Sequence, residues 1–226
     1  MSKLQKKFSA LRAARFNAKL CIADLERQLE AIKNDLSILT QDKANLTKLH
    51  TEKLQGKVDE EVFKMGALLS DYYREAKEAY NKSREVESIK LTSRAAILSP
   101  LLAAMSNEDL LTLYPARHGN KVDRLLLDEV LSLRVESNYR TGEVLGPKFE
   151  ILKKRLRHEL PEAEQAALDE LDAVDLMDAY TGAVYDEVNL SVKERSKSLK
   201  LEESVKRTRC KTDADNIEKH FLEGLN

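Results

Sequence analysis

The chain has 226 residues, of which 42% are hydrophobic and 34% are charged, and it contains only seven Gly and four Pro. So few residues that permit sharp turns argue against a compact α/β enzyme and favour long helices with charged outer faces. The formal net charge is −1, so the chain as a whole has no field that would attract nucleic acid or a membrane surface.

The N-terminal region carries a long apolar repeat. Alternating steps of four and three residues from Leu4 to Leu46 pass through thirteen positions, of which eleven are apolar and the other two are Arg15 and Lys43. Such a repeat keeps one side of a helix facing a partner helix, as knobs-into-holes packing requires. We therefore predict a coiled coil rather than an ordinary core helix. The residues assigned to this interaction stripe are Leu4, Phe8, Leu11, Ile22, Leu25, Leu29, Ile32, Leu36, Leu39 and Leu46.

Charge is segregated along the chain. Residues 1–23 carry six basic side chains and no acid, whereas residues 159–192 carry ten acids and no Lys or Arg. Such blocks can pair within one chain, between copies, or with a partner. Because the apolar stripe continues through the basic region, a solvated helix face or docking onto an acidic partner is favoured over insertion into a DNA groove. The six basic residues remain candidate phosphate contacts: Lys3, Lys6, Lys7, Arg12, Arg15 and Lys19.

The repeat loses its register after Leu46, and Gly56 precedes a second, thinner repeat that starts at Val58. A turn near Gly56 would fold residues 3–54 and 58–90 into an antiparallel hairpin. Alternatively, one helix runs from about residue 3 to 90 with a discontinuity in its register. Gly costs only about 1 kcal/mol inside a helix, so it does not force the turn. The thin second stripe favours the hairpin, because it suits a helix lying beside the first.

Shorter helices are expected after residue 90. Ser93 can cap a helix over residues 94–105, which Pro100 would split. The pattern from Ser106 to Asp109 predicts a capping box and a helix that ends at Pro115. A loop over 118–120 and a helix over Lys121–Ser137 follow.

The rest of the chain alternates between clear breaks and helical patterns. Residues 138–147 contain Gly142, Gly146 and Pro147 and predict a loop, followed by a helix over Lys148–His158. Pro161 suits the first turn of a helix that reaches about Tyr180, where Thr181 and Gly182 break or kink it. Residues 188–192 are interpreted as helical or irregular, and a last helix covers Asp213–Leu222 with Thr212 as its cap.

No motif for catalysis, metal binding or nucleotide binding stands out. A Gly-rich phosphate loop, a dinucleotide fingerprint and Glu-x-x-His pairs are all absent from the sequence. Cys21 and Cys210 are remote from each other and are expected to be free thiols in a reducing compartment. Four acids at three-residue spacing turn about 60° per step around a helix, so we interpret them as a solvated face: Asp169, Asp172, Asp175 and Asp178. We expect neither an enzyme nor a cofactor.

The sequence thus predicts an all-α protein with a long N-terminal coiled-coil helix or helical hairpin, followed by a smaller multi-helix domain. The expected division is residues 1–90 and 91–226. The expected function is that of a non-enzymatic scaffold, adaptor or component of an assembled particle such as a virion, which self-associates or binds a partner protein through the stripe. The alternative is a nucleic-acid-binding accessory protein that uses the basic N-terminal helix. The longest apolar stretch, residues 95–105, is too short to cross a bilayer, and a cytoplasmic location or one inside a particle is expected.

Overall fold

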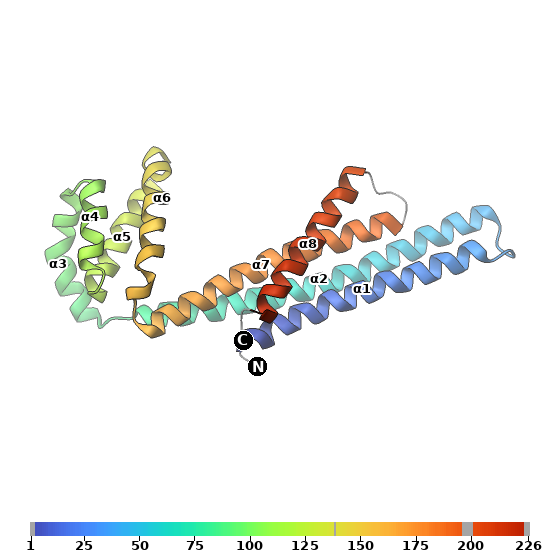
Figure 1. Ribbon diagram of the computed structural model, residues 1–226, viewed down its shortest axis with the longest axis horizontal. Coiled ribbons are helices and arrows are strands. Elements are labelled where there is room, and N and C mark those ends of the chain that lie inside the picture. The colour runs from blue at the N-terminus through green and yellow to red at the C-terminus, as the bar shows by residue number, and fades with distance from the viewer. Residues whose placement is uncertain (1–2, 138, 196–200, 224–226) are drawn as a thin grey trace. The chain divides into compact units, whose positions relative to one another are not determined.

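The computed structural model describes residues 3–137, 139–195 and 201–223, which form eight α-helices and one 3-10 turn without any β-strand (Figure 1). The all-α class predicted from the sequence is therefore confirmed. None of the described helices is long and apolar enough to cross a membrane. The elements are α1 (Lys3–Asn34), α2 (Thr40–Arg84), α3 (Ser88–Ala104), α4 (Asn107–Arg117), α5 (Lys121–Ser137), α6 (Tyr139–Leu156), η1 (Arg157–Glu159), α7 (Glu162–Arg195) and α8 (Leu201–Glu223).

The chain folds into two compact units whose boundaries fall inside α2 and α7. Unit 1 consists of residues 1–76 and 170–226, and unit 2 consists of residues 77–169. The sequence had suggested a different division, at residue 90. The difference arises because α7 packs against α1 and α2 and so belongs mostly with the N-terminal helices.

In unit 1, α1 and α2 form an antiparallel hairpin with α7 packed along it (Figure 1). The hairpin that the sequence favoured is confirmed, but its turn covers residues 35–39, and the position predicted near Gly56 is wrong. The carboxylate of Asp35 accepts hydrogen bonds from Ser37 N at 2.9 Å and from Ser37 Oγ at 2.6 Å. A short acidic side chain such as Asp35 can accept hydrogen bonds from the backbone N–H groups of a turn. Gly56, in contrast, lies within α2, where a Cβ would meet open space.

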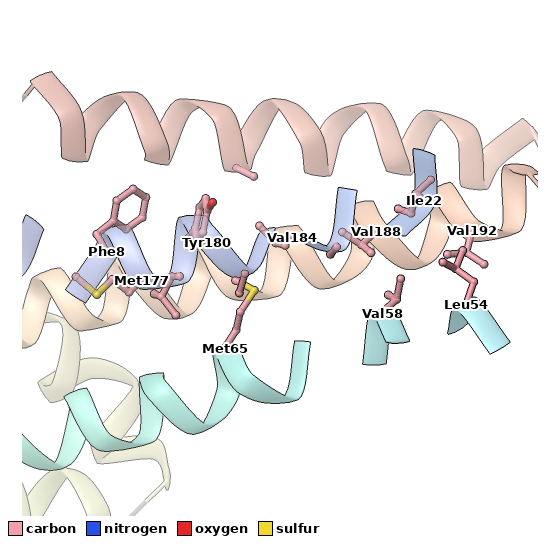
Figure 2. Close-up of a cluster of buried hydrophobic side chains, with 14 of the residues drawn as sticks. Phe8, Ile22, Leu54, Val58, Met65, Met177, Tyr180, Val184, Val188 and Val192 are labelled. Atoms are coloured by element: carbon pink, nitrogen blue, oxygen red, sulfur yellow. The ribbon is translucent and has the colours of Figure 1, made fainter. Parts of the chain in front are cut away.

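The core of unit 1 draws apolar side chains from four helices (Figure 2). The Phe8 ring stacks on Phe221 with 4.2 Å between centroids and lies 4.9 Å from Tyr180. Burial of large side chains stabilises each by about 1.5–3 kcal/mol relative to exposure. The buried members include Phe8, Leu11, Ile22 and Leu25 of α1, Leu54, Val58 and Met65 of α2, Met177, Tyr180, Val184 and Val188 of α7, and Ala214 and Phe221 of α8.

The break predicted at Thr181 and Gly182 is wrong, because α7 continues to Arg195. Thr181 Oγ1 donates to the carbonyl of Met177 at 2.9 Å, so this hydroxyl is accommodated within the helix. Tyr180 and Val184 are buried on either side of Gly182. Their burial exceeds the cost of about 1 kcal/mol that Gly imposes on a helix.

Unit 2 is a small helical bundle in which α5 contacts α3, α4 and α6. Two sequence predictions are confirmed here. The capping box of α4 forms as expected between Ser106 and Asp109, and α5 spans Lys121–Ser137. Asn120 Oδ1 starts α5 by accepting from two backbone N–H groups. The buried core comprises Leu102, Leu110, Tyr114, Leu126, Leu127, Leu131, Leu145, Phe149 and Leu156.

The loop predicted over residues 138–147 is wrong for the nine residues that the structure describes, since α6 begins at Tyr139; residue 138 lies outside the described part. Pro147 lies inside this helix and costs about 3 kcal/mol or more. Burial of Leu145 and Phe149 on either side of Pro147 offsets this cost.

Other predicted helix ends also shift. Pro115 does not end α4, which continues to Arg117, and Pro100 does not split α3. Thr212 lies within α8 instead of capping it, and its Oγ1 donates to the carbonyl of Thr208 at 3.0 Å.

Candidate interaction surface

The first half of the interaction stripe is covered by helices of the same chain. Phe8, Leu11, Ile22 and Leu25 are buried, and Leu4 packs at the edge of the same cluster. The covering helices are α2, α7 and α8 (Figure 2). Over this part of α1, the repeat therefore finds its partner helices within the chain.

The second half of the predicted stripe does not form one helix face, because α1 ends at Asn34 and residues 35–39 form the turn into α2. We call residues 29–49 the hairpin tip. The side chains of Leu36 and Leu39 in the turn are 97% and 73% exposed. Ile32 and Leu46 are half-buried, and of the described residues only Leu29 connects the tip to the core cluster. The tip thus presents apolar side chains that no described residue of α7 or α8 covers.

A small cavity of about 210 Å³ lies between α1 and α2 at the base of the tip. Leu25 and Leu54, both buried, form the apolar part of its lining. Its remaining lining is polar: Asp24, Gln28, His50, Lys53 and Lys57.

Arg15, one of the candidate phosphate contacts, is buried inside unit 1 with only 3% of its surface exposed. Its guanidinium lies 2.8 Å from Glu187, 2.7 Å from Asp215 and 2.9 Å from Glu218. Burial opposes the charge, but the carboxylates of Asp215 and Glu187 outweigh it and raise the pKa of Arg15. Arg15 therefore ties α1 to α7 and α8 instead of facing solvent.

Four further basic residues of this set are also paired within unit 1. Lys7 is buried, with its Nζ 3.0 Å from Glu170 and 3.1 Å from Glu75. Lys3 lies near the same two acids, at 3.5 and 3.4 Å. Arg12 pairs with Glu218, and Lys19 lies 3.2 Å from Glu187. Lys6 is exposed. The segregated charges thus meet within one chain, and the structure does not assemble these side chains into a basic surface.

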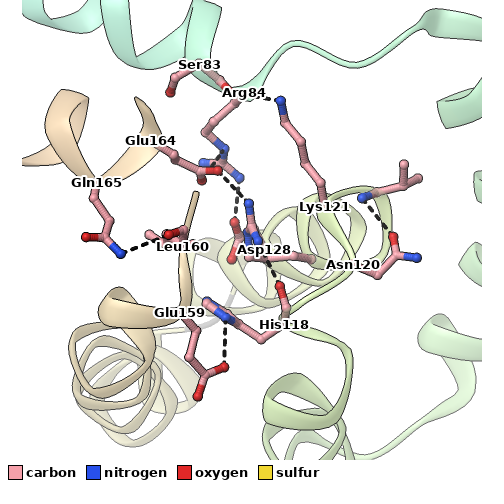
Figure 3. A network of polar contacts seen from close by, with 12 residues as sticks. Ser83, Arg84, His118, Asn120, Lys121, Asp128, Glu159, Leu160, Glu164 and Gln165 are labelled. Carbon is pink, nitrogen blue, oxygen red and sulfur yellow. Dashed lines mark hydrogen bonds and ion pairs between the residues drawn. The ribbon is translucent and has the colours of Figure 1, made fainter. Parts of the chain in front are cut away.

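A buried polar network in unit 2 could not be found from the sequence (Figure 3). Arg124 donates to Glu164 at 2.5 Å and to the carbonyl of His118 at 2.8 Å. Asp128 accepts from Tyr114 Oη at 2.7 Å and from Arg84 at 2.5 Å. These residues come from α2, α4, α5, α7 and the turn after α4, and no short spacing connects them. Their carboxylates are engaged by Arg and Tyr, so the network is suited to joining helices.

Two groups in this network have shifted pKa values. Burial, together with the nearby positive charge of Arg124, lowers the pKa of His118, whose Nδ1 lies 3.5 Å from Glu159. Burial and the Asp128 carboxylate raise the pKa of Tyr114. His118 is therefore held as the neutral imidazole near neutral pH.

Among residues 3–137, 139–195 and 201–223, no group of three or more His, Cys, Asp or Glu side chains is placed to hold a metal ion. Comparison with protein-family models, with curated protein sequences and with solved structures finds no match. The assignment of function therefore depends on the geometry of the chain itself.

Proposed function

We propose that the protein is a non-enzymatic structural protein that self-associates through its hairpin tip. The observation that carries this proposal is the exposure of apolar side chains at the hairpin tip, beyond the helices that cover the first half of the stripe. Leu36 and Leu39 are exposed in the turn between α1 and α2, and Ile32 and Leu46 are half-buried in the two helices that flank it. Exposed apolar side chains that gather in one part of a surface mark interaction sites.

A second copy of the chain is a suitable partner for the tip. Two helical hairpins that meet through the same surface across a two-fold axis form a four-helix arrangement. Charges of both signs lie on each tip helix, such as Glu30 and Lys33 on α1 and Asp42 and Lys48 on α2. Copies therefore meet without a large block of like charge, which suits a scaffold or a subunit of an assembled particle.

The test is the mass in solution of the full chain and of the Leu36→Glu/Leu39→Glu variant, measured by light scattering. At about 1 M salt, where contacts between exposed charges are screened, the wild type is expected to be a dimer or larger and the variant a monomer, because two carboxylates would be buried at the contact. Leu20→Glu is the matched control, since Leu20 is an exposed Leu of α1 outside the tip. A wild type that is monomeric at all accessible concentrations would falsify self-association through the tip.

The nucleic-acid alternative gains no support from the geometry. Lys7 and Arg15 are buried against acids, and Lys3, Arg12 and Lys19 are ion-paired. Binding to phosphates would require these intramolecular pairs to break.

A further inference from the structure

The exposed face of α6 in unit 2 alternates apolar and basic side chains. Val144, Lys148, Ile151 and Arg155 follow one another at steps of four, three and four residues, so they form one line over about 16 Å of helix. Val144 is 61% exposed and Ile151 is 67% exposed. Lys148 and Arg155 are exposed, and neither forms an ion pair with an acid that the structure describes. We call these four residues the α6 stripe.

Unit 1 carries a groove with the opposite charge, between α2 and α7. Its volume is about 300 Å³. Leu69 and Val174 give it an apolar floor, and Asp175 and Asp178 stand at its edge. Both acids are exposed, and neither is paired with a basic side chain in the described part of the chain. Gly66, Ser70 and Tyr73 complete the lining. We call this the α2–α7 groove.

We propose that the α6 stripe of one copy docks into the α2–α7 groove of a second copy of the same chain. Val144 and Ile151 would cover the apolar floor, while Lys148 and Arg155 would reach Asp175 and Asp178 on their long side chains. Both charged sets lack partners within the described chain, so docking neutralises them without breaking an existing ion pair. Complementary potentials of this kind steer association and exclude wrong partners.

The two surfaces are different, so the contact is heterologous. A heterologous contact joins copies head to tail and yields a ring if the rotation closes, or a filament if it does not. The hairpin tip, in contrast, would meet an identical surface across a two-fold axis. The α6 contact therefore goes beyond the proposed function and depends on separate residues.

The test uses two charge-reversed variants of the full chain, one with Lys148→Glu/Arg155→Glu and one with Asp175→Lys/Asp178→Lys. Both carry Leu36→Glu/Leu39→Glu so that the hairpin tip does not contribute. At low ionic strength, the tip variant alone is expected to form head-to-tail assemblies detected by light scattering. Each charge-reversed variant by itself should associate at least about tenfold more weakly, because like charges then face each other. An equimolar mixture of the two should regain the assembly, since each stripe meets an oppositely charged groove on the other variant.

Restoration by mixing can only come from contact between copies. A tip variant that stays monomeric, a charge-reversed variant that assembles unchanged, or a mixture that stays monomeric would each overturn the proposal. The assembly should also dissociate at about 1 M salt, where the Debye length falls to about 3 Å.

A second variant tests the groove without changing charge. Gly66→Leu should fill the groove and block docking, since a Cβ at Gly66 meets no atom within 4 Å and so the helix backbone of α2 can carry a side chain there. Gly56→Leu is its matched control in the same helix, also with open space around the glycine but outside the groove. Equal assembly of the two glycine variants would contradict docking in the groove.

Discussion

At the scale of single residues, Arg15 shows how a polar side chain on an apolar stripe can be a structural contact. We expect Arg15→Met to lower the free energy of unfolding by about 3–5 kcal/mol, because Glu187 then remains buried with only the half-exposed Lys19 beside it. Urea-induced unfolding followed by circular dichroism measures this change. Arg12→Met, at an exposed ion pair of the same helix, should cost no more than about 1 kcal/mol.

The double variant Arg15→Met/Glu187→Leu separates loss of attraction from the cost of an unpaired buried charge. Removing both buried charges should recover most of the stability lost in Arg15→Met, since an apolar pair of similar volume is often as stable as a buried ion pair. If Arg15→Met is no less stable than Arg12→Met, then the arginine does not occupy the buried site that we describe.

The lowered pKa of His118 predicts that the stability of unit 2 depends on pH. Its folded pKa lies below the ordinary value of 6.5, so the unfolded chain binds the proton more tightly. The groups facing it are Glu159 of η1, Arg124 and Asp128 of α5, and Glu164 of α7. Stability from the neutral imidazole is complete above pH 6.5 and is lost as the pH falls from there to the folded pKa.

The measurement compares urea midpoints of the wild type and His118→Gln across this pH range. The wild type should lose stability relative to the variant on acidification, because Gln does not titrate. Parallel curves for the two proteins would show that His118 is not held neutral by the fold. Carboxylates that titrate at lower pH affect both proteins alike, so they do not disturb the comparison.

At the scale of elements, a substitution at Gly56 tests whether α2 is continuous at this position or forms a turn there. We expect Gly56→Ala to raise the free energy of unfolding by about 0.5–1 kcal/mol, since Ala loses less backbone entropy than Gly in a helix and a Cβ here meets open space. In a turn that needs a left-handed backbone, the same change would destabilise the protein. A lower denaturation midpoint for Gly56→Ala would therefore argue against the continuous helix.

Some helices could be predicted from local sequence patterns, whereas others form because of packing between distant parts of the chain. α5 could be predicted to its ends, because its apolar spacing lies between a loop on one side and Gly and Pro residues on the other. α6 could not, because Gly146 and Pro147 predict a loop, and packing against α4 and α5 reverses that preference. Gly146 shows this directly, since a Cβ there would lie 3.5 Å from Val135 of α5.

The candidate interaction surface was also predictable only in part, because sequence spacing gives local information and not long-range packing. Spacing alone identified the stripe from Leu4 to Leu29, but it did not reveal the turn at residues 35–39 that exposes Leu36, and only the positions of α7 and α8 determine that Ile22 is buried. The basic residues were visible as a set, yet their acidic partners Glu187 and Glu218 lie some 170 to 200 residues further along the chain. No spacing in the sequence predicts ion pairs between residues so far apart in the chain.

At the scale of the whole molecule, the division into units predicts which fragments fold. Residues 77–169 contain the complete second core cluster and the buried pair of Arg124 and Glu164. Many domains of this size fold alone, so we expect this fragment to be monomeric and to unfold cooperatively in urea. The fragment 91–226 instead carries α7 without α1 and α2, which leaves Met177, Tyr180 and Val184 without their cover. It should aggregate or expose apolar surface, as light scattering and dye binding would show.

The shorter fragment 91–169 tests whether the end of α2 belongs to this unit. Without Arg84, the Asp128 carboxylate keeps Tyr114 as its partner but loses the charge that neutralises it. Lys121 also loses the carbonyls of Ser83 and Glu85, to which its Nζ donates at 2.8 Å. We therefore expect this fragment to unfold at a lower urea concentration than residues 77–169. Equal midpoints would mean that the last turns of α2 contribute nothing, and a boundary at residue 90 would then describe this side of the unit better than one at residue 77.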